Sequence, residues 1–227
     1  MAQLIPYEIL NGRENMLIDE QLLNTAINKG IEEPILRLYG WSPSCVSLGR
    51  NQKSGNINYD YCKENKINIV KRITGGRALL HENEITYSFI CPTNFLKNGE
   101  SIIHSYKEIS GALIKAFNSL GINLSFPEQK KAATKFEYCM SISTGADLSF
   151  NNKKVIGSAQ CRKQNFILQH GSILFDYDAE KIIKIFGERP DKAQITTVKE
   201  LNPKVTKEQL CEAIKSGFEQ YFQINFL

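Results

Sequence analysis

The sequence predicts an α+β fold with many strands and intervening helices. Stretches in which apolar residues recur at helical spacing alternate along the chain with short strand-like stretches bounded by turn residues. No internal repeat or low-complexity segment interrupts this alternation. The chain has 227 residues, which is enough to bury a sizeable core. We therefore expect a single domain over residues 1–227, with residues 188–227 as a short C-terminal helical extension.

The first half of the chain begins with a helix at Glu14–Lys29, because apolar residues recur there near helical spacing and Gly30 follows as a stop. Short apolar runs bounded by turn residues then predict four strands and one short helix. The strands are Ile35–Tyr39, Cys45–Leu48, Asn68–Ile73 and Thr86–Ile90, and the short helix is Tyr59–Asn65. Ser101–Leu120 carries the clearest apolar stripe of the chain, and Gly121 ends it.

The second half begins with a predicted strand at Ile122–Phe126. Asn151-Asn152 favours a hairpin turn, because Asn tolerates positive φ, and it joins strands at Ala146–Phe150 and Lys154–Ser158. Two further elements follow, a strand within Asn165–Phe175 and a helix at Asp178–Phe186. Thr206 with Gln209 indicates a capping box for a last helix that runs to about Phe222.

Charge and cysteine usage exclude several classes of function. The net charge of +4 is spread along the chain without a run of like charges, which argues against a nucleic-acid partner. No apolar run is long enough to span a bilayer, so no membrane association is expected, and Met1–Leu10 lacks the features of a signal peptide. The six cysteines form no C-x-x-C pair, and none has a histidine at zinc-finger spacing, so no metal site is expected. These features predict a cytoplasmic protein with mostly free thiols.

The segment from Arg72 to His81 is the first candidate for a binding site. Gly75 and Gly76 directly follow a predicted strand, and a glycine pair lets the backbone approach a ligand closely. The guanidinium of Arg72 is suited to an anionic group. The alternative is a plain glycine turn with His81 as a structural histidine, and this segment alone does not decide between the two.

Two more segments carry polar or small residues inside strand-like runs. Lys154 precedes Gly157-Ser158-Ala159, whose backbone N–H groups are suited to stabilise an oxyanion. The alternative there is a hairpin with two solvated lysines. Gln169–Ser172, which includes His170, indicates a pocket wall, and the alternative is an ordinary strand with a glycine bulge.

Cys139 is the candidate nucleophile. A cysteine attacks as the thiolate, and a nearby ammonium group lowers the pKa of the thiol. Lys154 lies across the predicted hairpin region from Cys139, so the two side chains are candidates for such a pair. The alternative for Cys139 is the ordinary one, a small buried hydrophobic side chain.

Taken together and in this order, the segments resemble the lipoate/biotin protein ligase superfamily. Within it they resemble most the cysteine-dependent octanoyltransferases of the Gram-positive type, which take octanoyl groups from acyl carrier protein. The resemblance covers roughly Asn15–Phe175. It rests on the runs Tyr39-Gly40-Trp41, Lys71-Arg72-Ile73-Thr74-Gly75-Gly76-Arg77, Thr86-Tyr87-Ser88, Lys153-Lys154-Val155-Ile156-Gly157-Ser158-Ala159-Gln160 and Leu168-Gln169-His170-Gly171-Ser172-Ile173-Leu174.

The resemblance implies a fold of mixed β-sheets packed by helices, as in the catalytic domain of that superfamily. It also implies an acyl pocket with two walls and a substrate-binding histidine. The pocket residues would be Arg72, Gly75, Gly76, Ala78 and His81 on one wall, Gly157, Ser158 and Ala159 on the other, and His170 from the run that points to the transferase branch. Cys139 and Lys154 would be the catalytic pair, with Lys154 holding the Cys139 thiolate by its charge.

The implied reaction moves an octanoyl group from octanoyl-acyl carrier protein to Cys139 as a thioester. The group then passes to a lysine of a lipoyl-domain acceptor protein, such as the glycine cleavage H protein, in lipoate biosynthesis. A covalent intermediate divides one difficult transfer into two easier ones. The resemblance implies no cofactor and no metal, because the donor thioester is already activated.

Three alternatives stay open. An ATP-dependent lipoate–protein ligase would activate free lipoate as an adenylate, and Cys139 would be incidental. A transferase of the same branch would take the octanoyl group from an octanoylated carrier domain, by amide-to-amide transfer. A non-catalytic module that binds an acyl group or a lipoyl domain would keep the pocket glycines and need no nucleophile.

Overall fold

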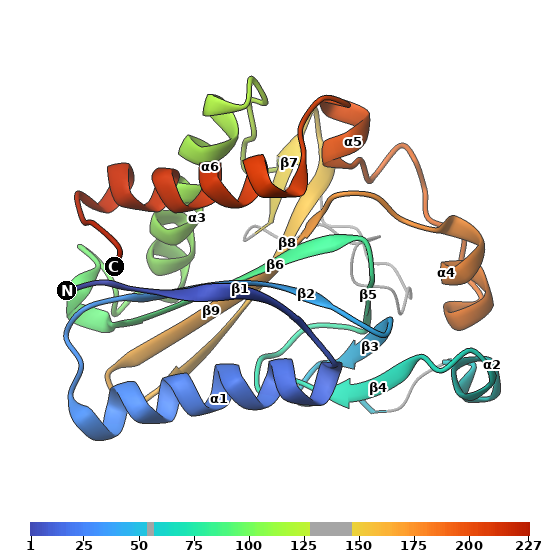
Figure 1. Cartoon of the computed structure of the whole chain (residues 1–227), viewed down its shortest axis with the longest axis horizontal. Coiled ribbons are helices and arrows are strands. Elements are labelled where there is room, and N and C mark those ends of the chain that lie inside the picture. The colour runs from blue at the N-terminus through green and yellow to red at the C-terminus, as the bar shows by residue number, and fades with distance from the viewer. Residues whose placement is uncertain (54–56, 128–146) are drawn as a thin grey trace.

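The computed structural model describes residues 1–53, 57–127 and 147–227, which form two sheets flanked by helices (Figure 1). The larger sheet has the strand order β1-β2-β6-β9-β8-β7. These strands are β1 (Gln3–Leu10), β2 (Ile35–Trp41), β6 (Glu84–Pro92), β9 (Phe166–Leu174), β8 (Lys153–Lys163) and β7 (Leu148–Phe150). Strand β1 is parallel to β2 and the other neighbouring pairs are antiparallel, so the sheet is mixed.

The smaller sheet has the order β4-β3-β5, with strands β4 (Asn68–Lys71), β3 (Cys45–Leu48) and β5 (Leu79–His81). It is also mixed, since β3 pairs in parallel with β4 and antiparallel with β5. The predicted α+β class with mixed sheets packed by helices is confirmed.

Helices cover both faces of the larger sheet, with α3 and α6 on one face and α1 on the other (Figure 1). The helices are α1 (Gly12–Lys29), α2 (Tyr59–Glu64), the 3-10 helix η1 (Thr93–Phe95), α3 (Ile102–Ser119), α4 (Ala179–Phe186), α5 (Val198–Leu201) and α6 (Lys207–Phe222). Within the ranges that the structure describes, none of them combines the length and apolar composition needed to cross a bilayer.

Side chains of β2 point alternately to the two faces of the larger sheet, and apolar side chains on both faces are covered by helices. Leu36 and Leu38 belong to the main hydrophobic cluster, together with Leu113 of α3 and Phe218 of α6. Ile35 points to the opposite face and packs in a separate cluster with residues of α1. The predicted C-terminal extension thus contains α6, whose buried face contributes to the main cluster beside α3.

The helix and hairpin signals read from the sequence are confirmed in detail. Gly30 ends α1 in the left-handed region, with φ of 59°. The capping box of Thr206 and Gln209 starts α6. Asn151 and Asn152 both have positive φ, 48° and 62°, at the turn between β7 and β8.

The predicted strand at Ile122–Phe126 is wrong. The segment forms only an isolated bridge, between Ser125 and Ser149, because it runs past the short edge strand β7. Two observed strands are missing from the sequence prediction. Strand β1 contains Pro6 and leaves most of its side chains exposed, so it lacks a strand-like apolar pattern, and β5 is only three residues long.

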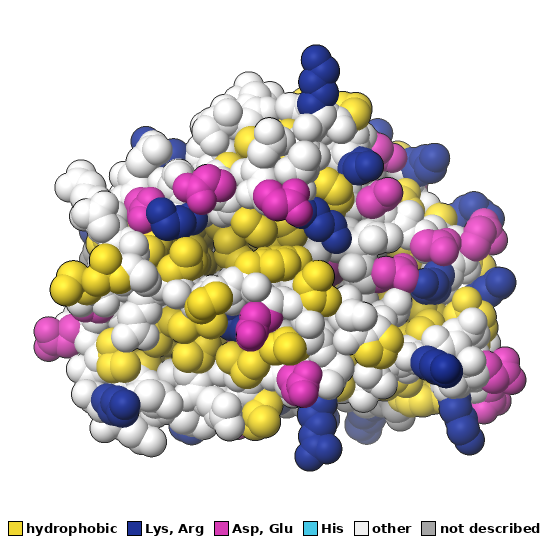
Figure 2. Space-filling view, in the orientation of Figure 1, with side chains coloured by type: hydrophobic (Ala, Val, Ile, Leu, Met, Phe, Trp, Pro, Cys, Tyr) yellow, Lys and Arg dark blue, Asp and Glu magenta, His cyan; other side chains and the backbone are white. Residues whose placement is uncertain are grey.

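One face of the molecule exposes apolar side chains. Figure 2 shows hydrophobic side chains gathered along the band that β1 occupies between α1 and α6. Strand β1 contributes Tyr7 and Ile9 to this surface, which are 41% and 59% exposed, and Leu17 of α1 is also exposed. We call Tyr7, Ile9 and Leu17 the β1 surface.

Candidate active site

A cavity of about 100 Å³ is lined by residues of both sheets and of α1. Its walls combine small, apolar and titratable side chains from distant parts of the chain. The lining residues are Met16, Tyr39, Trp41, Ser47, Arg72, Gly76, Leu79, His81, Thr86, Asp147, Lys154, Gly157, Ser158, Ala159, His170, Gly171 and Ser172.

Eight of the residues singled out in the sequence meet at this cavity: Arg72, Gly76, His81, Lys154, Gly157, Ser158, Ala159 and His170. Gly75 and Ala78 do not line it. Gly75 is exposed and Ala78 is fully buried in a cluster with residues of α4. Cys139 lies outside the described residues. The roles assigned to all these residues stay predictions.

Lys154 reaches the cavity because of an irregularity in β8. The register between β7 and β8 shifts by one residue, so that Leu148 faces Ile156 while Ser149 faces Lys154. Val155 and Ile156 are consecutive and yet both belong to the main hydrophobic cluster, whereas Lys154 lines the cavity. The bulge therefore turns the lysine out of the core, and the interpretation with two solvated lysines is wrong for Lys154, which is 1% exposed.

The ammonium group of Lys154 is held by a buried carboxylate. Its Nζ lies 3.0 Å from Asp147 Oδ2, and both side chains are almost fully buried. The backbone N–H of Ser158 donates to the other oxygen of this carboxylate, Oδ1, over 3.4 Å. This amide, which the sequence suggested as an oxyanion donor, points at a carboxylate in this structure.

Arg72 fixes the glycine loop at the cavity. Its Nε and one terminal nitrogen donate to the carbonyl of Gly75, and that nitrogen also donates to the carbonyl of Arg77. The other terminal nitrogen donates to the carbonyl and the hydroxyl of Ser47. These contacts match the five N–H donors of a guanidinium. The side chain therefore acts as a clamp on the loop.

Gly76 has a backbone that suits this clamp. Its φ is 96°, a conformation that L side chains rarely adopt, and a Cβ there would lie 2.7 Å from the Arg72 guanidinium.

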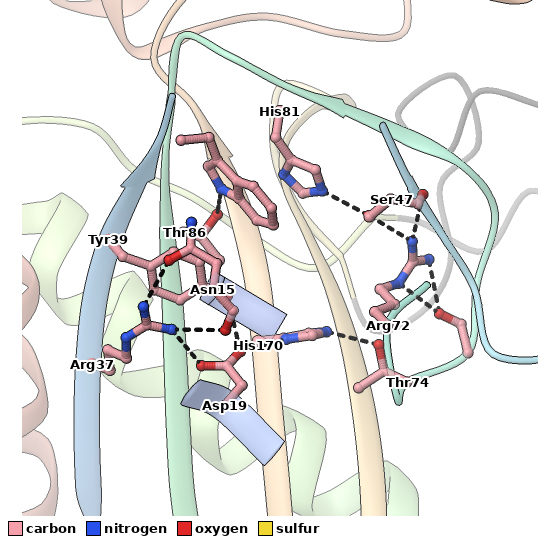
Figure 3. Close-up of polar contacts among 12 residues, drawn as sticks. Asn15, Asp19, Arg37, Tyr39, Ser47, Arg72, Thr74, His81, Thr86 and His170 are labelled. Carbon is pink, nitrogen blue, oxygen red and sulfur yellow. Dashed lines mark hydrogen bonds and ion pairs between the residues drawn. The ribbon is translucent and has the colours of Figure 1, made fainter. Parts of the chain in front are cut away.

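The first buried histidine chain, which we call the Glu84 chain, runs along one side of the cavity. His81 Nδ1 lies 2.7 Å from Glu84 Oε1. On the other side of the ring, His81 Nε2 lies 2.7 Å from the hydroxyl of Ser47 (Figure 3). Thr86 and Ser172 also donate to Glu84. Burial alone would raise the pKa of Glu84, but the charge of His81 and the hydrogen bonds from His81, Ser172 and Thr86 lower it below its ordinary value.

The second buried chain, which we call the Asp19 chain, contains the other cavity histidine. His170 Nδ1 lies 3.0 Å from Asp19 Oδ2, and its Nε2 lies 2.7 Å from the hydroxyl of Thr74 (Figure 3). Arg37 forms an ion pair with Asp19 at 2.9 Å, and the Tyr39 hydroxyl donates to the same carboxylate. Burial and the charge of Asp19 raise the pKa of Tyr39 well above its ordinary value, so the phenol keeps its proton.

Gly171 is not the glycine bulge that the sequence allowed. The register of β9 with β6 and with β8 is continuous through Gly171. A Cβ at this position would lie 2.6 Å from the Tyr87 ring and 2.8 Å from the Ser158 hydroxyl. The glycine thus makes room for the Tyr87 side chain against the sheet.

Four charged residues of the site are missing from the sequence prediction: Asp19, Arg37, Glu84 and Asp147. Arg37 had one signal, since a charge inside an apolar strand needs a buried partner. Glu84 is the first residue of β6 and precedes the strand predicted at Thr86–Ile90, so it had no such signal. Asp19 and Asp147 had none, because each lies beside ordinary helix or turn residues.

Comparison with known proteins identifies a family for the chain. Residues 11–219 match the Lipoyl protein ligase A/B catalytic domain family. The chain is 38% identical to octanoyltransferase LipM of Clostridioides difficile over 95% of this chain and 85% of that protein. It is 31% identical to octanoyltransferase LipM of Staphylococcus aureus over 92% and 83% of the two chains.

The solved structures that it resembles have the same fold. Lipoate-protein ligase A bound with ATP superposes with a TM-score of 0.81 at 21% identity, over 100% of this chain and 87% of that one. A lipoate protein ligase of Thermoplasma acidophilum with bound lipoic acid gives a TM-score of 0.77, also at 21% identity and the same coverage. With the identities of the curated relatives, these matches confirm the predicted resemblance. The chain belongs to the lipoyl protein ligase A/B catalytic domain family and, within it, to the LipM-type octanoyltransferases, which are acyltransferases.

Proposed function

We propose that the chain moves an octanoyl group from octanoyl-acyl carrier protein, through a thioester on Cys139, to a lysine of a lipoyl domain. Residues 1–227 would act as one catalytic domain in the cytosol. The observation that carries this proposal is the Lys154 ammonium, which is buried at the wall of a largely apolar cavity. A fixed cation there is suited to hold a thiolate or a developing oxyanion.

The described cysteines support the choice of Cys139 by their chemistry. Cys45, Cys62, Cys91, Cys161 and Cys211 are all free thiols. Burial raises the pKa of each of them, to about 12 for Cys45, so each is a poorer thiolate than an ordinary cysteine. Cys161 lies nearest to the Gly157–Ala159 segment in sequence, and burial is the largest cause of the raised pKa of its thiol as well.

The proposed transfer has two steps of the same kind. In the first, the Cys139 thiolate bonds to the carbonyl carbon of the donor thioester, and the π electrons pass to the oxygen. When the carbonyl re-forms, the donor thiolate leaves. In the second step the neutral amine of the acceptor lysine attacks in the same way, Cys139 leaves as the thiolate, and the proton of the amine passes through solvent to the donor thiolate released in the first step.

Structural neighbours suggest both the acceptor in this proposal and the rival activity, which is ATP-dependent lipoate ligation. One structural neighbour is described as a bipartite lipoate protein ligase with its E2 lipoyl domain, and it covers 98% of this chain at a TM-score of 0.72. This supports a lipoyl domain as the acceptor. Another neighbour is bound with ATP. At 20% and 21% identity both neighbours share the fold of this chain, so each suggests a partner or an activity that an experiment has to decide. The test must therefore include ATP.

Intact-protein mass spectrometry tests the proposal. Wild type, Cys139→Ala and the control Cys161→Ala are each mixed with octanoyl-acyl carrier protein without ATP. We expect a hydroxylamine-sensitive octanoyl adduct on wild type and on Cys161→Ala, and none on Cys139→Ala. An absent adduct on wild type, with lipoate transfer to a lipoyl domain that requires ATP, would replace the proposal by the ligase activity.

A further inference from the structure

Two hollows of the structure meet at one side chain, Met16 of α1. The first is the cavity described above. The second is a surface groove of about 670 Å³ between α1 and β4, lined by Leu17 and Glu20 on one side and by Ile69, Val70 and Ile73 on the other. Among the described residues, Met16 is the one that lines both hollows. It therefore separates the cavity from the groove.

The aromatic walls near Met16 are fixed by polar contacts. The Tyr39 hydroxyl donates to Asp19 at 2.9 Å. The Trp41 indole N–H donates to the Thr86 hydroxyl at 2.8 Å, and the indole stacks on His81 with 3.9 Å between ring centroids. Met16 is half-buried and packs against the cluster formed by Tyr39, Trp41 and Cys45. Its unbranched side chain has several rotatable bonds and a polarisable sulfur, so it adapts its shape where the aromatic rings do not.

The size of the cavity makes this adaptation necessary for an acyl chain. The cavity measures about 100 Å³. A cavity of about 150 Å³ holds benzene, which has six carbons. An eight-carbon chain needs more space than that, and the groove lies on the other side of Met16.

Lys154 lines the cavity but not the groove. A chain whose carbonyl lies at Lys154 and whose tail extends toward the groove therefore meets Met16. We propose that Met16 sets the longest acyl chain that the cavity accepts, by how far its side chain yields toward the groove. The proposal rests on the proposed acyl transfer and adds a residue that determines its chain-length specificity.

Substitutions at Met16 are expected to lengthen or shorten the longest acyl chain that the cavity accepts. Met16→Ala opens the cavity to the groove, and Met16→Phe fills the same space with a rigid ring. Leu17→Ala is the matched control. Leu17 is the next residue of α1, is 48% exposed, and lines the groove but not the cavity. Each variant is offered hexanoyl-, octanoyl-, decanoyl- and dodecanoyl-acyl carrier protein in equal amounts, and the acyl-enzyme adducts are counted by mass spectrometry.

We expect Met16→Ala to raise the ratio of decanoyl to octanoyl adduct by about 10-fold or more, since one methylene in an apolar pocket changes selectivity by about 10- to 200-fold. Met16→Phe should lower the ratio of octanoyl to hexanoyl adduct by about 10-fold. Leu17→Ala should keep both ratios. Adduct rates that change by the same factor for every chain length in both Met16 variants would overturn the proposal.

A second measurement keeps this inference separate from the acyl-transfer proposal. Free hexanoic, octanoic, decanoic and dodecanoic acids are added to the same variants, and the rise in Tm is recorded for each. We expect the longest acid that raises Tm to be longer for Met16→Ala than for wild type, and shorter for Met16→Phe. If wild type forms no adduct with any donor, the transfer proposal fails, and the Tm series still decides the role of Met16.

Discussion

The Asp19 chain and the Glu84 chain border the same cavity and have the same order of groups, a carboxylate, a histidine and a hydroxyl. They differ in how the charge of the carboxylate is balanced. Asp19 has a buried ion pair with Arg37. Among the residues that the structure describes, Glu84 has no lysine or arginine partner and is held by His81, Thr86 and Ser172.

This difference separates the roles of the two histidines. Asp19 already has the guanidinium of Arg37 as its cation, so His170 serves mainly as a hydrogen-bond link between Asp19 and Thr74. Glu84 instead relies on His81 as its ion-pair partner, with His81 Nδ1 2.7 Å from Glu84 Oε1, so His81 is the side chain that holds this buried carboxylate. Four substitutions sharpen this comparison.

The largest effect is expected for Arg37→Met. The change leaves the Asp19 carboxylate buried without its cation, which costs about 3–5 kcal/mol of unfolding free energy. Urea denaturation followed by circular dichroism measures the loss. The control is Arg189→Met, which breaks an exposed pair with Glu180 and should cost about 0–1 kcal/mol. A loss for Arg37→Met as small as that of the control would mean that another group compensates Asp19.

A smaller effect with a distinct pH dependence is expected for Glu84→Gln. The amide faces donors that need an acceptor, so we expect a loss of about 1–3 kcal/mol at neutral pH. The folded-state pKa of Glu84 lies below its ordinary value of 4.5. Its ionised form therefore stabilises the fold above that pH, and this contribution is lost as the pH falls below it.

Urea denaturation at a series of pH values checks this prediction. The stability of wild type should decline more steeply than that of Glu84→Gln between about pH 5 and about pH 3. Glu20→Gln, at an exposed site on α1, should follow the wild-type curve. Parallel curves for wild type and Glu84→Gln would show that the carboxylate has the same pKa in the folded and unfolded states.

The smallest effects are expected at the hydroxyl ends of the two chains. Ser47→Ala removes a partner of both His81 and Arg72, whereas Thr74→Val removes a partner of His170. We expect a loss of about 1–2 kcal/mol for Ser47→Ala and about 1 kcal/mol for Thr74→Val. Urea denaturation of both variants side by side gives the order. The reverse order would mean that His170 depends on its hydroxyl more than His81 does.

The sequence predicts the parts of the site that lie in short local motifs. Arg72, His81, Lys154 and His170 each stand in a run whose composition suggests a pocket, and the structure brings these runs to one cavity. The charged network behind them could not be predicted in the same way. The Asp19–Arg37 pair joins a helix and a strand 18 positions apart, and such pairing depends on packing that no local pattern encodes. The turn of Lys154 toward the cavity depends on a one-residue register shift with β7, which is equally invisible in the sequence.

The β1 surface has a consequence for how the protein behaves in concentrated solution. An apolar strand at the edge of a sheet offers unpaired backbone groups to a neighbouring molecule and is a template for aggregation. Strand β1 is the edge of the larger sheet, and its first residues are already paired, because Leu4 donates to the carbonyl of Leu227 and Leu227 donates to that of Ala2. Farther along, its register with β2 shifts between Ile5 and Glu8, around Pro6. A proline has no N–H to donate, and a bulge bends the strand, so a second molecule cannot extend the ladder along the whole edge. Pro6 and the bulge around it therefore limit edge-to-edge pairing between molecules.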